Sequence, residues 1–389
     1  MASGQIYPSL RVRRKEGRWF RLFPLFFAAF LLLSTLVFYH VLWVKLPWLP
    51  MNILIVDKTV PLKNFNEHNA IVWILKHYKA GPREGKFLSN NDFLGYHPNE
   101  RRCETLLSTD ISRYDLIYLA DTYGTYDYKM GFKEYEANLP RKNLDVSLVC
   151  GGLDRKEAQM LLTSTKQAAT IIGEFNILGF PTSLDPEALQ TLEKVFKIKW
   201  TGWYGKHYDN LSSTPKWVKD LYEAVYGEDW GFAGPGTVMV KKSEMVGIEP
   251  DVMIFKDPRG YIRPFAIFVK KTPLTEGIDS PLTYDGWFEV VKPEKGTETI
   301  AYYHMAETPA HLAELRERGL KPIFPAIVVN RTRAKAIYFA GDFADNKFLA
   351  LSPTFFGTEY AMKALSRANR TDNFFWRFYV PLMRNVLYW

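Results

Sequence analysis

The feature that most constrains this chain is an uncharged apolar run near its N-terminus. No Asp, Glu, Lys or Arg occurs from Leu22 to Val44. A helix rises about 1.5 Å per residue, so this run is long enough to cross the roughly 30 Å hydrocarbon core of a bilayer. A cleaved signal peptide has an apolar region of only about 7–15 residues, and no small-residue cleavage site follows here. We therefore predict an uncleaved transmembrane signal anchor over residues 22–44.

The charges before this run predict its orientation. Residues 1–21 contain a single acid, Glu16. Their basic residues near the run are Arg11, Arg13, Arg14, Lys15, Arg18 and Arg21. Lys and Arg are retained on the cytoplasmic side, so we expect a cytoplasmic basic tail over 1–21 and an extracytoplasmic domain over 46–389. The first predicted partner is thus the lipid bilayer, in a single-pass arrangement.

The composition of the chain limits which further kinds of partner are expected. Much of the net charge of +8 belongs to the short basic tail, and the rest is dispersed along the chain. We therefore expect no nucleic-acid partner. The two cysteines, Cys103 and Cys150, could pair outside the cytoplasm, although Cys150 lies in an apolar run and is first interpreted as a small buried hydrophobe. Aromatic residues make up 15% of the chain, which is compatible with stacking against sugars.

Strands and helices alternate in the first part of the extracytoplasmic region. The expected strands are the apolar runs Met51–Asp57, Tyr114–Asp121, Leu144–Cys150 and Ala169–Asn176. Helices are expected at 69–78 and 155–166, the second with Asp154 as its N-cap and Glu157 three residues on. This alternation predicts an α/β fold with a doubly wound, mainly parallel sheet and helices on both faces.

The later part of the chain has a different pattern. From about 232 to 305, short β-like runs are broken by Gly and Pro, which predicts a β-rich elaboration at one end of the sheet. Pro325–Asn330 and Ala334–Asp342 are expected to form a hairpin turned at 331–333. A helix at about 358–368 and an aromatic C-terminal helix, packed on the body, complete the predicted fold.

Three short motifs carry a resemblance to a known family. They are Val149-Cys-Gly-Gly-Leu153, Ile171–Asn176 and Arg333–Asp342. The first is similar to the Gly-Gly turn of the class I glutamine amidotransferase-like superfamily, and more closely of its trehalose-utilisation (ThuA-like) branch. The second falls at the nucleophile elbow of that superfamily, roughly Gly-x-Cys-x-Gly, and the third resembles its late hairpin, in which a His often stands where this chain has Asp342. The resemblance covers most of residues 51–345 and implies a flavodoxin-like α/β fold.

The departures from that pattern imply a catalytically degenerate relative, a pseudoenzyme. Alignment of Gly173 with the first elbow glycine puts Phe175 at the nucleophile position, where acyl-enzyme chemistry requires a thiol or hydroxyl. Cys150 lies one strand too early, and no downstream His-x-Glu completes a triad. His304 and His311 are the only late histidines. We therefore expect the ancestral glutaminase reaction to be absent.

Polar residues follow several of the expected strands. They are Asp57, Asp121, Thr122, Tyr123, Gly151, Gly152, Glu174, Asn176, Asp342, Asp345 and Asn346. Ligands in open α/β sheets bind at these strand ends. Two carboxylates could perform glycosidase-type acid and base chemistry, several could hold a hard cation, or all could simply cap loops. Glu174 is the sharpest candidate, because a charge inside an apolar run must pair or point into a cleft.

A second candidate site is the aromatic segment from Trp200 to Asp209. Trp200, Trp203 and Tyr204 could form a stacking platform for a sugar ring, or belong to a rigid half-buried loop. Neither Gly-x-Gly-x-x-Gly nor Gly-x-x-x-x-Gly-Lys occurs, and the histidines and cysteines lack zinc-ligand spacing. We accordingly predict no cofactor and no metal.

Three functions are compatible with these features. The favoured hypothesis is a non-catalytic, membrane-tethered module that binds a cell-envelope glycan, or a partner in its synthesis or export. An alternative is a carbohydrate-active hydrolase that uses Glu174 with Asp121 or Asp342 as acid and base. A third possibility is a structural scaffold that recruits membrane partners.

Overall fold

The computed structural model describes the chain in ten segments and divides it into two units. The described residues are 18–60, 65–127, 147–164, 169–241, 249–257, 265–305, 308–331, 335–345, 354–366 and 371–389. The first unit comprises Met1–Leu46 with Pro353–Thr358, and the second comprises Pro47–Ser352 with Glu359–Trp389. Asn346, one of the predicted site residues, lies outside the described residues.

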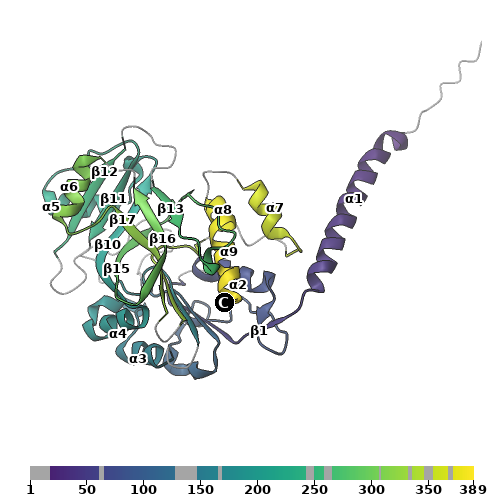
Figure 1. Cartoon of the computed structure of the whole chain (residues 1–389), viewed down its shortest axis with the longest axis horizontal. Coiled ribbons are helices and arrows are strands. Elements are labelled where there is room, and N and C mark those ends of the chain that lie inside the picture. Colours follow the sequence, from purple (N-terminus) through teal and green to yellow (C-terminus); the bar gives the residue numbers. More distant parts are fainter. Residues whose placement is uncertain are drawn as a thin grey trace, which may run out of the picture. The chain divides into compact units, whose positions relative to one another are not determined.

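The first unit contains helix α1 (Arg18–Val44), shown in purple in Figure 1. Its stretch Leu22–Val44 is long and apolar enough to cross a membrane, as the uncharged run predicts. A distant segment of the chain packs along this helix. The backbone N–H of Phe356 donates to the carbonyl of Tyr39 at 3.1 Å, and the ring of Phe355 lies 5.8 Å from that of His40.

The second unit is built on a ten-stranded sheet with the order β14-β13-β16-β17-β18-β9-β6-β2-β4-β5. Its central strands β18, β9, β6, β2 and β4 pair in parallel, and the strands on either side pair antiparallel. The strands are β2 (Ile53–Asp57), β4 (Leu94–His97), β5 (Arg102–Cys103), β6 (Leu116–Asp121), β9 (Thr170–Gly173), β13 (Phe265–Val269), β14 (Leu282–Thr283), β16 (Thr297–Met305), β17 (Ile323–Asn330) and β18 (Lys335–Phe339). The sheet is therefore mixed, and the predicted mainly parallel arrangement holds only at its centre.

A second sheet is wholly antiparallel, in the order β12-β11-β10-β15. Its strands are β10 (Ile198–Tyr208), β11 (Gly236–Lys241), β12 (Asp251–Lys256) and β15 (Phe288–Pro293). The segment predicted as one β-rich elaboration therefore contributes strands to both sheets. Two small pairs complete the strands, β1 (Leu49–Pro50) with β3 (Ala80–Gly81) and β7 (Thr125–Asp127) with β8 (Ser147–Cys150).

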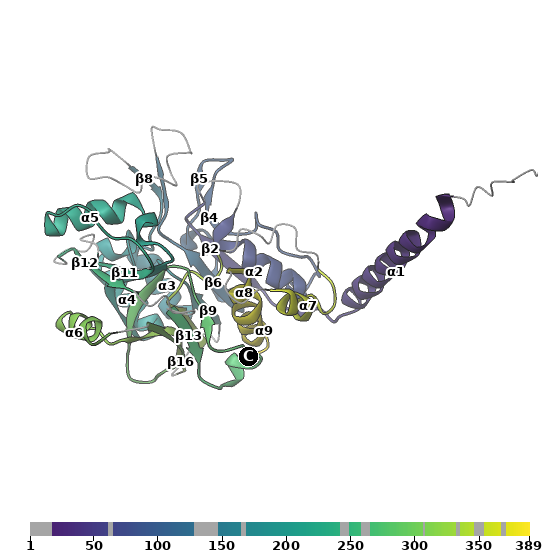
Figure 2. The same cartoon turned by 90° about the horizontal axis from the view of Figure 1, so that it is seen from above.

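The predicted strand at 144–150 is thus not part of the large sheet. Its described portion, β8, pairs antiparallel with β7, and a disulfide joins Cys150 to Cys103 of β5 with an S–S distance of 2.04 Å. Figure 2 shows β5 and β8 at the same edge of the second unit. The pairing answers the question that the sequence left open, and such bonds persist in oxidising compartments.

Helices pack on both sheets, and Figure 1 shows α3 and α4 next to each other and α5 and α6 beside β12 of the second sheet. They are α2 (Asn66–His77), α3 (Arg155–Ser164), α4 (Pro186–Phe196), α5 (Lys216–Tyr226), α6 (Pro309–Glu317), α7 (Thr358–Leu365), α8 (Thr371–Phe374), a π-helical turn (Phe375–Tyr379) and α9 (Val380–Leu387). The predicted cap of α3 is present, because Asp154 Oδ1 accepts from the N–H of Glu157 at 2.8 Å and the Glu157 carboxylate accepts from the N–H of Asp154 at 3.1 Å.

The aromatic C-terminal helix belongs to the core of the second unit. Phe375, Trp376 and Tyr379 are almost completely buried, and the Trp376 ring lies 5.1 Å from that of Trp73 in α2. This confirms the expectation that the last helix packs on the body. Burial of such large rings is a major source of stability, at about 25 cal/mol per Å² of apolar surface.

Candidate functional site

Three of the predicted acids lie at the carboxyl ends of neighbouring strands. Asp57 ends β2 and Asp121 ends β6, and these two residues are paired across the parallel strands. Glu174 directly follows β9, the next strand, and its N–H donates to the carbonyl of Leu119 at 3.0 Å. The sequence prediction of an acidic strand-end cluster therefore holds for these three residues.

Asp57 is completely buried and fully occupied by protein contacts. Its Oδ1 accepts from the N–H of Thr59 at 2.9 Å, and its Oδ2 lies 2.6 Å from Nδ1 of His68 in α2. Nε2 of His68 faces the carbonyl of Asn90 at 3.0 Å. Because both ring nitrogens are used internally, His68 orients Asp57 and is not available as a base for a ligand.

Asp121 lies beside Asp57 and joins three loops. Its Oδ1 accepts from Thr59 Oγ1 at 2.9 Å and from the N–H of Tyr123 at 2.5 Å, and its Oδ2 accepts from Asn176 Nδ2 at 3.5 Å. Burial, and then the nearby charge of Asp57, raises the pKa of Asp121 to about 7.

Glu174 is enclosed rather than exposed in a cleft. The hydroxyl of Tyr118 donates to one carboxylate oxygen, and the backbone N–H groups of Phe343 and Ala344 donate to the other. Burial raises the pKa of Glu174 to about 8, although these hydrogen bonds oppose the rise. With only 1% of its surface exposed, Glu174 holds the loop that follows β18. It positions Asp342 and Asp345, which lie on that loop.

Asp342 and Asp345 complete an acidic cluster with Glu67, a residue of the first turn of α2. Burial raises the pKa of Glu67 well above its ordinary value, followed by the charges of Asp342, Asp121, Asp345 and Asp57. Burial, and then the charges of Asp345, Glu174 and Asp121, likewise raises the pKa of Asp342, while Lys206 lowers it. Both side chains are recessed but still reachable by solvent.

Among the described residues, Glu67 and Asp342 lack the direct ion pair that buried carboxylates usually have. In the described part of the chain, neither Glu67 nor Asp342 forms an ion pair with a basic side chain. Carboxyl groups that crowd together without a cation favour their protonated forms. A ligand that donates hydrogen bonds or carries positive charge would relieve the same repulsion.

A further buried acid, Glu289 of β15, connects the cluster to the second sheet. Its carboxylate accepts from Trp200 Nε1 at 2.7 Å and from the hydroxyl of Tyr338. Burial raises the pKa of Glu289 to about 7, against those hydrogen bonds and one from the N–H of Asn176, and the charge of Asp121 raises it further. The sequence analysis missed Glu289, although an acid inside the apolar run Phe288–Val291 is the same signal that identified Glu174.

The aromatic segment Trp200–Asp209 is not a loop. It belongs almost entirely to strand β10, in which Trp203 is 3% exposed and Tyr204 is 7% exposed. Neither ring is therefore available as a stacking platform. These rings were expected in a loop, whereas they belong to a strand. Successive side chains of a strand point to opposite faces, and here Trp203 packs into one hydrophobic cluster and Tyr204 into another.

Other aromatic side chains provide a half-buried wall beside the acids. Trp287 stacks on Trp217 with ring centroids 5.7 Å apart, and Tyr208 lies 6.5 Å from Trp287. Lys206 Nζ lies 5.9 Å from the ring centroids of both Tyr208 and Trp287. The N–H of Asp342 donates to the carbonyl of Trp287 at 3.1 Å, so the backbone of the aromatic wall is bonded to that of the acidic cluster.

The Gly151–Gly152 turn is held from within. Gly152 has a φ of +67°, and its carbonyl accepts from Lys58 Nζ at 2.7 Å. The same ammonium forms a buried ion pair with Glu157 of α3 at 2.8 Å. A side chain on Gly151 would come within 2.8 Å of the Cα of Gly124, so the close approach of two backbone segments explains this glycine.

The turn after β9 resembles an elbow without a nucleophile. Asn176 has the left-handed φ of 66°, and the preceding Phe175 is 8% exposed with its ring 5.7 Å from that of Tyr204. Neither residue carries a thiol or a hydroxyl. Among the described residues, no group of three or more His, Cys, Asp or Glu side chains has the geometry to hold a metal ion.

Comparisons with known proteins give only distant likenesses. No protein-family model matches the chain, and no curated protein matches its sequence. Its structure is similar to that of a ThuA-like protein from Bacteroides uniformis, with 10% identity, a TM-score of 0.34, and coverage of 82% of this chain and 94% of that chain. It is also similar to the structure of SMU.1228c, with 10% identity, a TM-score of 0.36, and coverage of 86% and 100%. Likenesses this distant carry no argument about activity.

Proposed function

We propose that this chain is a membrane-anchored binding protein whose body lies outside the cytoplasm. Helix α1 provides the anchor, and the basic residues before it keep the N-terminus in the cytoplasm. The disulfide between Cys103 and Cys150 supports the same topology, because such bonds are rare in the reducing cytoplasm.

The proposed ligand is a glycan of the cell envelope, bound at the strand-end cluster. The observation that carries this proposal is the backbone hydrogen bond from Asp342 to Trp287, which joins a residue of the acidic cluster to a residue of the half-buried aromatic wall. Lys206 is near both, because it lies 5.9 Å from the Trp287 ring centroid and its charge lowers the pKa of Asp342. Carboxyl groups suit sugar hydroxyls, and aromatic faces suit the apolar face of a sugar ring. A protein partner in glycan synthesis or export that presents such groups would fit the same site.

Binding without turnover is the simplest reading of the chemistry. The turn after β9 has no nucleophile, and both oxygens of Glu174 already accept hydrogen bonds from the protein. Glu174 is therefore a positioning residue in this proposal. The third possibility, a scaffold that recruits membrane partners, gives no role to the acidic cluster that solvent can reach.

The test is a thermal-stability screen of the full chain in detergent micelles against envelope oligosaccharides, nucleotide sugars and divalent cations. A ligand that binds only the folded state adds about 2.7 kcal/mol of stability at 100 times its Kd. We expect a shift with an oligosaccharide that is lost in Asp342→Asn and in Trp287→Ala. Asp220→Asn and Trp230→Ala, on the α5 side of the second sheet, are matched controls that should keep it. A screen in which no oligosaccharide shifts the wild type would contradict the proposal.

A hydrolase remains the second candidate, because the pKa of Asp121 is raised to about 7, which suits an acid that works near neutral pH. Asp121 would then act with Asp342. The same oligosaccharides, incubated with the protein and analysed for new reducing ends, decide between the two functions. Turnover that Asp121→Asn abolishes would replace the binding proposal with this one.

A further inference from the structure

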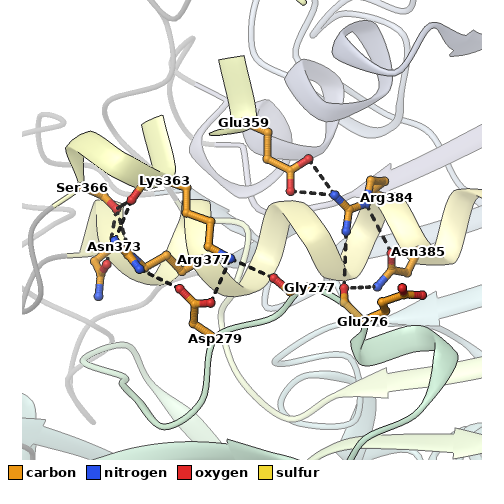
Figure 3. Close-up of polar contacts among 10 residues, drawn as sticks. All are labelled: Glu276, Gly277, Asp279, Glu359, Lys363, Ser366, Asn373, Arg377, Arg384 and Asn385. Carbon is orange, nitrogen blue, oxygen red and sulfur yellow. Dashed lines mark hydrogen bonds and ion pairs between the residues drawn. The ribbon is translucent and has the colours of Figure 1, made fainter. Parts of the chain in front are cut away.

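Helix α7 has its polar face turned toward the body of the protein. Figure 3 shows Glu359 and Lys363 pointing from α7 toward the C-terminal helix and the loop around Gly277. The Glu359 carboxylate accepts from Arg384 Nη1 at 2.9 and 3.0 Å. Lys363 Nζ lies 2.9 Å from Asp279 Oδ1 and donates to the carbonyl of Gly277 at 2.9 Å. Both charged residues of the helix are thus used internally.

Further hydrogen bonds fix this orientation. Arg377 Nη1 lies 2.6 Å from Asp279, its Nη2 donates to the carbonyl of Lys363 at 2.7 Å, and its Nε donates to Ser366 Oγ at 3.2 Å. Arg384 also donates to the carbonyl of Glu276 at 3.3 Å. The helix is held near both ends, so it cannot rotate its polar face toward water without breaking these contacts.

The opposite face of α7 is exposed and carries no charge. Its residues are Tyr360, Ala361, Ala364 and Leu365, which form two i, i+4 pairs. Tyr360 is 70% exposed and Leu365 is 74% exposed. A helix on the surface of a soluble protein has the reverse arrangement, with its apolar face inward and its charges outward. Helix α7 is therefore an inverted amphipathic helix.

The chain reaches α7 directly from the flank of α1. The N–H of Phe356 donates to the carbonyl of Tyr39, which lies five residues, or about 7 Å of helix, before the end of the apolar run at Val44. Phe356 is itself 46% exposed. A turn closed by Thr358 Oγ1 and the carbonyl of Phe355 at 2.9 Å then starts α7. The exposed apolar face thus follows within a few residues of a segment that packs along the proposed membrane anchor.

We propose that the face formed by Tyr360, Ala361, Ala364 and Leu365 lies on the outer surface of the lipid bilayer. This inference rests on the proposed anchoring by α1. Interfacial helices lie with their apolar face among the headgroups and upper acyl chains, and tyrosine is enriched at that depth. The ion pairs on the other face then fasten this membrane-facing helix to the body. Lipid, rather than a second protein, is the occupant because this face continues from a segment bound to the membrane helix.

The test uses nitroxide labels on the full chain reconstituted in vesicles of zwitterionic phospholipid. Ala364→Cys places a label on the proposed face, and Ala224→Cys places a matched label on an exposed alanine of α5. Ala29→Cys in α1 reports on the anchor itself. The two native cysteines are joined in a disulfide and do not take the label. Collision of each label with oxygen, which concentrates in lipid, is compared with collision with a water-soluble nickel chelate.

We expect the oxygen-to-nickel collision ratio at residue 364 to exceed that at residue 224 several-fold and to approach that at residue 29. A label at 364 that matches 224, with 29 in lipid, would overturn the inference while leaving the anchor intact. A label at 29 that is itself accessible to nickel would overturn the anchoring and this inference together. A label at 364 shielded from both reagents would mean that protein, such as a second copy of the chain, covers the face instead of lipid.

Discussion

Two groups of acids differ in how their charge is compensated. The strand-end cluster comprises Asp57, Glu67, Asp121, Glu174, Asp342 and Asp345, and the α7 clamp comprises the ion pairs of Asp279 and Glu359 with Lys363, Arg377 and Arg384. At the clamp, Asp279 and Glu359 each lie within 3 Å of an arginine or lysine nitrogen. Against the effect of burial, hydrogen bonds from Lys363 and Arg377 lower the pKa of Asp279. At the strand ends, burial and mutual repulsion raise the pKa of Glu67 and Asp342 instead.

The acids of the α7 clamp therefore stabilise the folded state, whereas those of the strand-end cluster destabilise it. A paired acid strengthens the structure, whereas crowded acids whose pKa values are raised on folding cost stability at neutral pH. Titratable groups with strongly perturbed pKa values are common at functional sites, because catalysis needs groups whose pKa values match their task. Under the proposed function the strand-end cluster is the expected ligand site, whereas the ion pairs of the α7 clamp fix the orientation of that helix on the body.

The largest loss of stability is expected when a deeply buried ion pair, that of Lys58 with Glu157, is broken. Lys58→Met would leave Glu157 buried without its cation, since both side chains are only 2% exposed. Breaking a buried pair on one side costs about 3–5 kcal/mol, and urea unfolding of the full chain in micelles measures it. Lys216→Met, in the exposed pair with Asp220, is the matched control and should cost less than about 1 kcal/mol. Equal losses of stability in the two variants would show that burial does not decide how much an ion pair contributes to the fold.

An intermediate effect is expected at the clamp. Arg384→Met removes the basic partner of Glu359 and leaves it the hydroxyl of Tyr78. The Glu359 side chain is 7% exposed and that of Arg384 is 22% exposed. Because this pair is less deeply buried than that of Lys58, we expect a loss of about 2 kcal/mol. Addition of Glu359→Gln to this variant should restore part of it, which a double-mutant cycle measures. Complete additivity of the two changes would show that the pair does not act as a clamp.

A smaller effect of opposite sign is expected at the strand ends. Glu67→Gln keeps the shape of the side chain and removes one of the repelling charges. We expect this variant to be more stable than the wild type by about 1 kcal/mol at pH 8, or roughly 2 °C in Tm. Calorimetry at pH 8 measures the difference. Destabilisation at that pH would mean that the charge of Glu67 is favourable in the folded protein.

The smallest effect on stability is expected at the outer face of α7. Leu365→Ser changes a side chain that is 74% exposed, so the unfolding free energy in micelles should change by less than about 0.5 kcal/mol. In the reconstituted protein, the same variant should hold helix α7 less closely against the vesicle surface, since the apolar face of the helix is smaller. A large loss of stability would assign Leu365 to the core of the protein and not to its surface.

Local patterns in the sequence predicted the central fold well. Short apolar runs that end in acids became β2 and β6, and the hairpin expected from 325 to 342 is formed by β17 and β18. The cap of α3 was also foreseeable, because an N-cap and its capping box depend on residues only three positions apart. Such features are fixed by near neighbours, so the sequence contains them directly.

Features that depend on distant pairing were not foreseeable. Trp200–Asp209 was expected to be a loop, but most of it forms strand β10. This strand pairs with β11 and β15, which lie far along the chain. Glu67 was missed because its role depends on the packing of α2 near the strand ends. Asp345 and Asp342 were named from the sequence, but only the hydrogen bonds of Glu174 to the loop after β18 explain their place.

The most direct test of the central claim is the pH dependence of stability, compared between wild type and Asp342→Asn. A carboxyl group whose pKa is raised on folding stabilises the folded state fully below its ordinary pKa, near 4, and loses that contribution as the pH rises through the folded value. Asp121 and Glu289, with pKa values of about 7, and Glu174, with a pKa of about 8, define the window. The account predicts that the unfolding free energy of the wild type falls between pH 4 and 8 and falls less steeply in the variant. A wild type that gains stability over this range, or a variant with the same slope, would contradict it.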